Sequence, residues 1–348
     1  MDSRVTGSRS NTQGPSYSSP DHVRRSLLSV SNTLQSIKNR FKKKTSMNRS
    51  LDVLPLNVKH STGPSNCHET HPRKRAVLCG VTYQNNKYRL KGTINDVKKM
   101  RDLLIDHFGY SKECIRVLTE EEEDPAFIPT KKNIQDSLKW LVEGSEPGDR
   151  LVFYFSGHGL RQPDFNNDER DGFDETICPV DFMQEGMILD NDINSTIVRP
   201  LKKNVTLHAI VDACHSGTIL DLECIYNART KNWEDNSPPS KAKKCTDGGI
   251  AIGLSACGDD QMAADTSAFT GDEMAGAMTY ALIQTVQRNS KLTYGSLLEI
   301  IHETLEQVNN GKCFGSRFLH KVFHRSIIQD PLLSSSEEFE VYQKEFVL

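Results

Sequence analysis

One cysteine and one histidine occupy positions where an α/β sequence places reactive side chains. Cys214 follows an apolar, β-branched run at 207–211, and His158 follows a second apolar run at 151–155. Such runs are typical of buried parallel strands, and the carboxyl ends of these strands carry the functional loops of open α/β sheets. If the two strands are neighbours, a thiol faces an imidazole, which is the arrangement of a nucleophile beside a general base.

Two glycines flank His158 and bear on how Cys214 is interpreted. A lone cysteine after a strand is more often a small buried hydrophobic residue than a nucleophile. Gly157 and Gly159, however, leave room for a substrate backbone to approach the imidazole. The separation of the two residues, 56 positions with each after a predicted strand, favours nucleophilic catalysis over core packing.

The segments around these two residues match a known pattern. The motif SGHG at 156–159 precedes DACHSG at 212–217, close to the spacing of roughly 50 residues in the caspase signature. From about Arg75 to the C-terminus, the chain resembles the type I metacaspases, which are relatives of the caspases in plants, fungi and protists. It has no Cys-x-x-Cys pair, which indicates that it lacks the zinc-finger prodomain of many plant members. Further segments that carry the resemblance are LKG at 90–92, ND at 95–96, DGFDET at 171–176 and DDQ at 259–261.

The resemblance implies a fold and a mechanism. The fold is α/β: a caspase-like, doubly wound, mostly parallel sheet flanked by helices, preceded by a disordered N-terminal extension. Cys214 is expected to attack a peptide carbonyl with His158 as its acid–base partner. The backbone N–H groups of Gly157 and Cys214 are the expected oxyanion donors. His215 is expected to be structural, and no organic cofactor is expected.

The substrate pocket that the resemblance implies is acidic. Its residues correspond to Asp96, Ser156 and Asp212, with Thr93 where many members have cysteine. Two carboxylates in a partly desolvated pocket favour Arg or Lys before the scissile bond. The structural alternative is that Asp96 caps a helix and that Asp212 accepts hydrogen bonds at a strand end.

Acidic residues are frequent in the segment after His158, from 164 to 192. Such a run is usually a solvated surface, but its oxygens also suit calcium, which takes about six to eight ligands. No EF-hand pattern is present. The resemblance implies an activating calcium site, and Asn191 in place of the usual aspartate removes a charge and predicts weak binding. The residues that correspond to this site are Asp174, Asp190, Asn191 and Asp221.

The composition of the chain suits a globular enzyme with a disordered part. Of 348 residues, 36% are hydrophobic and 26% are charged, and no apolar run reaches the roughly 18 residues of a membrane span. Nine cysteines without framework spacing favour a reducing compartment. We therefore expect a cytoplasmic protein, and we also expect a monomer.

Residues 1–74 differ in composition from the rest and are expected to form a largely disordered prodomain. The first fifty residues hold ten basic and two acidic side chains. Within them, residues 22–44 have the apolar spacing of an amphipathic helix. Three interpretations fit this segment: peripheral contact with an anionic membrane or a partner, organelle import, or a solvated tether.

From Arg75 on, strand and helix patterns alternate, which indicates a parallel sheet covered on both faces. Strands are expected at 76–81, 115–118, 151–155, 207–211, 250–254 and 339–342. Helices are expected at 93–108, 131–142, 274–286 and 294–308.

A break in this periodicity divides the expected peptidase domain, 75–348. Residues 226–247 are predicted to be an exposed basic linker between a large-subunit region (75–225) and a small-subunit region (248–348). An exposed basic loop is a natural place for self-cleavage by an enzyme that cuts after Arg or Lys.

These features together predict a calcium-stimulated cysteine endopeptidase that is made as a zymogen and processes itself. The resemblance links it to stress responses and programmed cell death. One alternative is a non-catalytic scaffold that acts through its basic N-terminal segment, which an intact Cys–His pair disfavours. Another is a nucleic-acid binder, for which the chain has no aromatic or motif signal.

Overall fold

The computed structural model divides the chain into two units, Met1–Gly63 and Pro64–Leu348, and the described residues all belong to the second. The prodomain predicted at 1–74 lies almost wholly outside the described residues, and so does its amphipathic segment at 22–44. The structure describes residues 72–84, 86–256, 265–266, 275–309 and 330–348.

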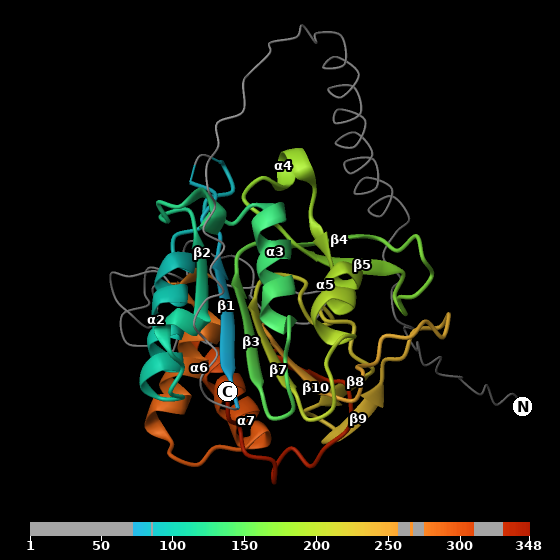
Figure 1. Ribbon diagram of the computed structural model, residues 1–348. Helices are drawn as coiled ribbons and strands as arrows, with labels where there is room; N and C mark the ends of the chain where they lie inside the picture. The colour runs from blue at the N-terminus through green and yellow to red at the C-terminus, as the bar shows by residue number, and fades with distance from the viewer. Residues whose placement is uncertain (1–71, 85, 257–264, 267–274, 310–329) are drawn as a thin grey trace, which may run out of the picture. The chain divides into compact units, whose positions relative to one another are not determined.

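Eight strands form the central sheet, in the order β2-β1-β3-β7-β10-β13-β8-β9. The first five in this order are parallel to one another, and β13, β8 and β9 are added as antiparallel strands. This mostly parallel sheet confirms the predicted fold class (Figure 1). The strand bounds are β1 Lys74–Gly80, β2 Ile115–Thr119, β3 Arg150–Ser156, β7 Thr206–Asp212, β8 Cys224–Asn227, β9 Asn232–Asp235, β10 Ile250–Ser255 and β13 Leu332–Ser335.

Helices cover both faces of the sheet because its central strands are apolar on both sides. In β3, Val152 and Tyr154 pack into the core beneath α2, α6 and α7, whereas Phe153 and Phe155 pack into the core beneath α3. In Figure 1, α3 and α5 lie in front of the sheet and α6 and α7 on its far side. The helix bounds are α2 Thr93–Asp106, α3 Lys131–Val142, α4 Phe182–Glu185, α5 Asp190–Ile193, α6 Ala277–Arg288 and α7 Tyr294–Asn309, with a π-helical turn η3 at Asn194–Val198.

The acidic segment after His158 is more ordered than the solvated loop its composition suggests. It forms a three-stranded antiparallel sheet, in the order β4-β5-β6. These strands are β4 Gly159–Pro163, β5 Phe173–Ile177 and β6 Ile188–Leu189. Since β4 begins directly after His158, this small sheet extends the histidine loop.

Two sequence expectations differ from the structure. The segment 226–247 is not loop throughout, because β8 and β9 pair as a hairpin at the edge of the main sheet. The last described strand is β13, and residues 339–342 form a loop and turn rather than the expected strand. Two short 3₁₀ turns, Lys112–Cys114 and Pro125–Phe127, precede β2 and α3.

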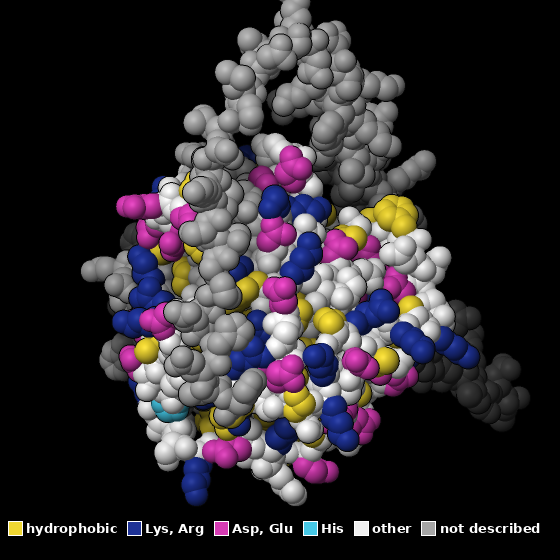
Figure 2. Space-filling model, viewed as in Figure 1, with side chains coloured by type: hydrophobic (Ala, Val, Ile, Leu, Met, Phe, Trp, Pro, Cys, Tyr) yellow, Lys and Arg dark blue, Asp and Glu magenta, His cyan; other side chains and the backbone are white. Residues whose placement is uncertain are grey.

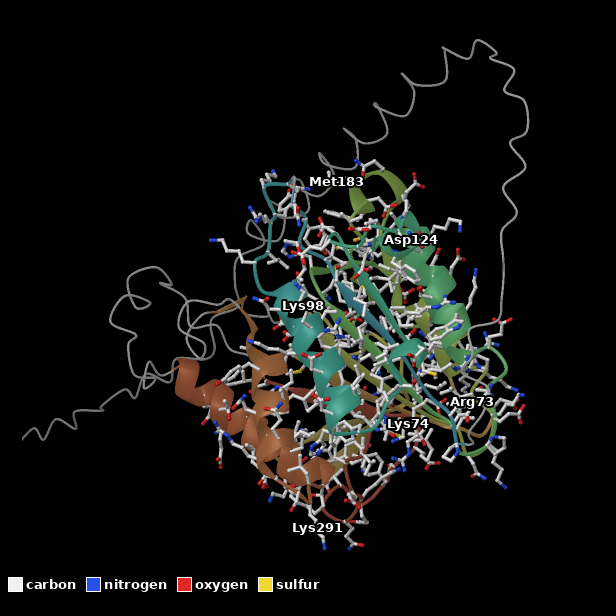
Figure 3. The ribbon with its side chains drawn as sticks, turned by 60° about the vertical axis from the view of Figure 1, so that its left-hand side comes forward. Arg73, Lys74, Lys98, Asp124, Met183 and Lys291 are labelled. Atoms are coloured by element: carbon white, nitrogen blue, oxygen red, sulfur yellow. The ribbon has the colours of Figure 1, made fainter. Side chains whose placement is uncertain are left out.

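A buried ion pair ties the start of β1 to the start of β3. The Arg73 guanidinium lies 3.1 Å from Asp149 Oδ2, and Asp149 is fully buried. Figure 3 shows Arg73 and Lys74 at the amino end of β1 and Met183 of α4 towards the opposite, carboxyl end of the sheet. The loops that follow β1, β3 and β7 therefore gather at one edge.

The described surface mixes charges of both signs. On the face in Figure 2, Lys and Arg side chains alternate with Asp and Glu side chains, and the described part of that face has no basic stripe of the kind that binds nucleic acid. Among the described helices, none has the length and apolar character needed to cross a membrane. Five described cysteines, Cys79, Cys178, Cys214, Cys224 and Cys245, are not in disulfide bonds, whereas Cys114 is disulfide-bonded.

Candidate active site

The register of two neighbouring strands brings the predicted pair together. β3 and β7 are parallel and paired from Arg150↔Thr206 to Ser156↔Asp212. His158 and Cys214 each lie two residues beyond that last pair, so they leave adjacent strands at the same level. Both side chains are half-buried, accessible to a substrate at the sheet edge.

His158 is held on three sides. Its Nε2 lies 2.7 Å from the carbonyl oxygen of Tyr88. Because a carbonyl oxygen can only accept, Nε2 carries the proton and the neutral ring keeps its lone pair on Nδ1. The His158 backbone N–H donates to Tyr83 Oη at 2.9 Å, and the two rings lie 4.7 Å apart. Tyr83 Oη in turn donates to the Cys178 carbonyl at 2.6 Å.

The loop that carries Cys214 is a tight turn packed against the histidine loop. A methyl group added at Gly159 would lie 1.9 Å from the Cys214 carbonyl oxygen, so only glycine permits this approach. His215 has a left-handed backbone with φ 50°, which places it in the turn and not on an extended strand end. Burial raises the pKa of the nearby Cys178 thiol to about 12, with a further contribution from the Cys214 charge, so Cys178 stays protonated.

The two pocket carboxylates converge on the start of α6. The Gly276 N–H donates to Asp96 Oδ2 at 2.9 Å. Asp212 Oδ2 accepts from the Thr279 N–H at 2.9 Å and from the Thr279 hydroxyl at 2.7 Å. A Cβ at Gly276 would lie 2.3 Å from Asp212 Oδ2 and 3.0 Å from Asp96 Oδ2, so both carboxylates reach the same point. The N-terminus of a helix favours negative charge there.

The other two predicted pocket residues differ in their placement. Ser156 donates from Oγ to Asp96 Oδ2 at 3.3 Å and therefore belongs to the same group. Thr93 begins α2, and its hydroxyl lies 3.2 Å from that of Thr82. Burial and the charges of Asp96 and Asp212 raise the pKa of Tyr154, whose hydroxyl bonds to Thr279 beneath the pocket.

One predicted oxyanion donor is engaged elsewhere. The Gly157 N–H points at the Asp212 carbonyl oxygen, 3.4 Å away. That bond is long and weak, but it directs the N–H back between the strands. It must open before Gly157 can donate to a substrate.

Three of the four predicted calcium residues fall in a group of buried or half-buried carboxylates, which we call the acidic cluster: Asp168, Glu169, Asp174, Asp190 and Asp221. Carboxylate oxygens of Glu169, Asp174 and Asp190 lie within 4.8 Å of one another. Asn191 follows Asp190 at the start of α5, and its N–H donates to Asp190 Oδ1 at 2.6 Å. The sequence prediction thus named Asp174, Asp190 and Asp221 but missed Asp168 and Glu169.

A lysine from a distant part of the chain lies in the acidic cluster. Lys244 Nζ is 2.8 Å from Asp168 Oδ2, 2.9 Å from Glu169 Oε1 and 2.8 Å from Asp221 Oδ2. Burial alone lowers the pKa of an ammonium, but the charge of Asp221 and the hydrogen bonds of these three carboxylates raise the pKa of Lys244 overall. It therefore remains charged.

Although Lys244 is charged, burial raises the pKa of several carboxyl groups in the acidic cluster and so favours their neutral form. Burial, then the charges of Asp221 and Glu169, raise the pKa of Asp190 to about 10. Burial and the charge of Asp221 raise the pKa of Glu169 to about 8, and burial also raises the pKa of Asp174. Among the described residues, Oδ1 of Asp168 and Oδ1 of Asp174 have no hydrogen-bond partner. Such oxygens suit a hard cation, and the residues present therefore fit calcium.

The mostly parallel sheet with helices on both faces defines a caspase-like fold, and comparison with known proteins gives the family. Residues 74–223 match the family model of the metacaspase peptidase C14 domain. The chain is 47% identical to Metacaspase-1 of Arabidopsis thaliana over 82% of its own length and 81% of the relative, and 35% identical to Metacaspase-1B of Neurospora crassa over 70% and 65%. The chain belongs to the metacaspases and is a cysteine-type endopeptidase.

The fold is also found in a solved structure. A protein from Geobacter sulfurreducens covers 79% of this chain and 98% of its own, with a TM-score of 0.52 and 18% sequence identity. At that identity the likeness concerns the fold alone.

Sequence reasoning missed several residues that hold the site together. Tyr83 lies three residues beyond β1, the neighbour of β3, so its place at the same sheet edge was a usable signal. Gly276 and Thr279 were hidden because they meet Asp96 and Asp212 across sequence separations of 180 and 67 residues. Nothing in its local sequence distinguishes Lys244 from its basic neighbours.

The close approach of the two loops generates a prediction. Gly159→Ala should lower kcat/KM by about 100-fold, because the new methyl group would displace the Cys214 carbonyl and with it the thiol. Peptide hydrolysis and thermal denaturation measure the two effects separately. The control is Gly109→Ala, where φ is +68° and the methyl meets nothing within 4 Å, so stability falls but activity per folded molecule does not. Equal activity of the two variants would contradict the steric argument.

Proposed function

We propose that this metacaspase hydrolyses peptide bonds through a dyad of Cys214 and His158. The observation that carries the proposal is the register of β3 and β7, which gives both residues the same offset beyond paired strand ends. The proton assignment on His158 supports it. Because Nε2–H is held by Tyr88, the basic Nδ1 is left for a thiol.

The reaction follows from these roles. The Cys214 thiol gives its proton to His158 Nδ1, and its sulfur attacks the peptide carbonyl to form a tetrahedral intermediate. The imidazolium, stabilised by the Tyr88 carbonyl, then protonates the departing amine and leaves a thioester on Cys214. Water, deprotonated by His158, releases the acid product. We retain the Cys214 N–H as an oxyanion donor, and the Gly157 N–H joins it once its bond to Asp212 opens.

We propose that Asp96 and Asp212 select Arg or Lys before the scissile bond. Both carboxylates are buried and share one location at the start of α6, with Ser156 beside them. A substrate guanidinium or ammonium offers several donors to such a pair, whereas a neutral or acidic side chain leaves two buried charges without compensation.

We propose that calcium bound by the acidic cluster stimulates the enzyme. Both catalytic loops connect to this cluster: Asp221 follows Cys214 on one loop, and β4, which starts after His158, pairs with the strand that carries Asp174. A divalent cation would supply the positive charge that these carboxylates need to remain ionised together, and so would fix the loops relative to each other. Asp174, Asp190 and Asp221 would hold it, with the carbonyl oxygen of Asn191 as a neutral ligand.

We also propose self-processing in the segment 236–247. Lys241 and Lys243 are exposed there, in a stretch without strands or helices. An enzyme that accepts Lys would cut such a stretch readily.

The N-terminal basic segment is proposed as a peripheral contact with a membrane or a partner, and a cytoplasmic monomer remains our expectation.

The dyad has a direct test. Cys214→Ala should abolish hydrolysis of Arg- and Lys-ended fluorogenic peptides, and His158→Ala should lower kcat by about 1000-fold or more, because the thiolate and the proton donor are lost. Circular dichroism confirms that each variant is folded. Cys245→Ala, which removes an exposed free thiol, is the matched control and should retain full activity. Wild-type turnover by Cys214→Ala would exclude this dyad.

The substrate pocket generates a second test. Asp96→Asn should lower kcat/KM for Arg- and Lys-ended peptides by about 100-fold or more, because a buried charge pair with the substrate is lost. Asp102→Asn, on an exposed position of the same helix, is the control and should change little. A melting temperature that falls in proportion to activity, with the preference for basic residues intact, would favour a purely structural role for Asp96.

The proposed calcium dependence generates a third test. Chelation should lower activity, and Asp190→Ala should reproduce the loss at all calcium concentrations, by about tenfold or more. The neighbouring Asp192→Ala removes an exposed carboxylate and should leave the calcium response unchanged. An enzyme equally active in chelator and in calcium would remove calcium from the proposed mechanism.

A further inference from the structure

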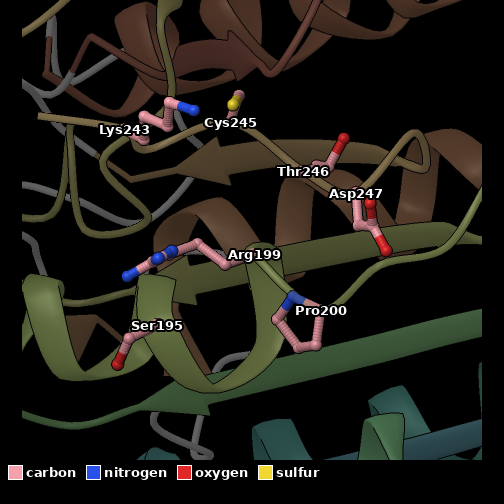
Figure 4. Close-up of a pocket in the computed structure, with 7 residues that line it drawn as sticks. All are labelled: Ser195, Arg199, Pro200, Lys243, Cys245, Thr246 and Asp247. Atoms are coloured by element: carbon pink, nitrogen blue, oxygen red, sulfur yellow. The ribbon is translucent and has the colours of Figure 1, made fainter.

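The position of Lys244 is unusual for a residue of an exposed basic loop. Lys243 and Cys245 on either side are exposed, whereas Lys244 is 5% exposed. Figure 4 shows the two neighbours lining an open pocket over η3, together with Arg199 and Asp247. The Lys244 side chain is buried instead and ends in the acidic cluster.

The backbone at Lys244 is fixed as well as the side chain. The Asn194 amide donates to the Lys244 carbonyl at 3.1 Å and to the Leu220 carbonyl at 2.9 Å. Leu220 belongs to the loop that follows Cys214. A single buried amide therefore joins the segment 236–247 to the nucleophile loop, next to the place where Lys244 Nζ contacts Asp221.

The charges of the acidic cluster indicate why a lysine lies there. Lys244 contributes one positive charge to five carboxyl groups, three of which contact its ammonium directly. Oδ1 of Asp168 and Oδ1 of Asp174 are buried and, within the described part of the chain, accept no hydrogen bond. The ammonium thus compensates part of the negative charge and leaves acceptor capacity unused.

We infer that Lys244 is the internal counter-ion of the acidic cluster, and that Lys244 and a divalent cation are alternative occupants of it. This inference deepens the proposed calcium site and rests on it. Asp221, one of the proposed calcium ligands, cannot bind calcium through Oδ2 at about 2.3–2.6 Å while an ammonium lies 2.8 Å from that oxygen, and the two cations repel each other within one cluster. Calcium binding therefore expels Lys244 and releases the segment 236–247 from the nucleophile loop.

Calorimetric titration of the full chain with calcium chloride tests the competition. Lys244→Met should bind calcium about tenfold or more tightly than the wild type, because no ammonium has to be displaced. Lys243→Met, at an exposed position next door, should match the wild type, and Lys244→Arg, which keeps the charge, should not gain affinity. Equal affinities for Lys244→Met and the wild type, or no binding by either, would overturn the inference.

A second measurement does not depend on a Lys244 variant that folds. In the Cys214→Ala protein, which cannot digest itself, acetylation of lysine amines is followed by mass spectrometry. Lys244 should be protected in chelator and become reactive in saturating calcium, while Lys243 reacts in both. Protection of Lys244 that persists in calcium would contradict the displacement.

The two proposals fail in different ways. Calcium that binds, expels Lys244 and leaves peptide hydrolysis unchanged would remove calcium stimulation and retain the inference. Calcium that stimulates hydrolysis with Lys244 still protected would do the reverse.

Discussion

The pairing of β3 with β7 is the constraint on which the rest of the site depends. Parallel strands in register deliver the residues after them to the same level of the sheet edge. A shift of one residue would turn Phe153 and Phe155 from one core to the other, so the hydrophobic packing of both faces fixes the register. The distance between thiol and imidazole is thus controlled by apolar burial far from the chemistry.

Around this pair, the remaining parts of the site come from different distances along the chain. Tyr83 and Tyr88, in the loop after β1, orient the imidazole. The start of α6 holds Asp96 and Asp212 with backbone N–H groups, which places the charges of the pocket at the positive end of a helix dipole. The acidic cluster links the histidine loop, the nucleophile loop and Lys244.

How much the sequence predicted depended on the range of the interactions. The strands before His158 and Cys214, and the helix at 131–142, follow from local apolar patterns and agree with the structure. The strands of the small sheet β4-β5-β6 were not predicted, because their charged residues obscure the alternation of a strand. Its order comes from pairing and from burial of Asp174 and Glu175, which local composition does not reveal. The ion pairs of Lys244 were hidden for the same reason, since its partners lie far away in the sequence.

The interleaving of strands has a consequence for a nicked molecule. In the order β7-β10-β13-β8, the two strands from beyond residue 247 lie between two strands from before it. On one side β10 is hydrogen-bonded to β7, and on the other side β13 is hydrogen-bonded to β8. A single cut in 236–247 therefore yields two fragments that stay associated as a noncovalent heterodimer, with Cys214 on one fragment and α6, which holds Asp96 and Asp212, on the other.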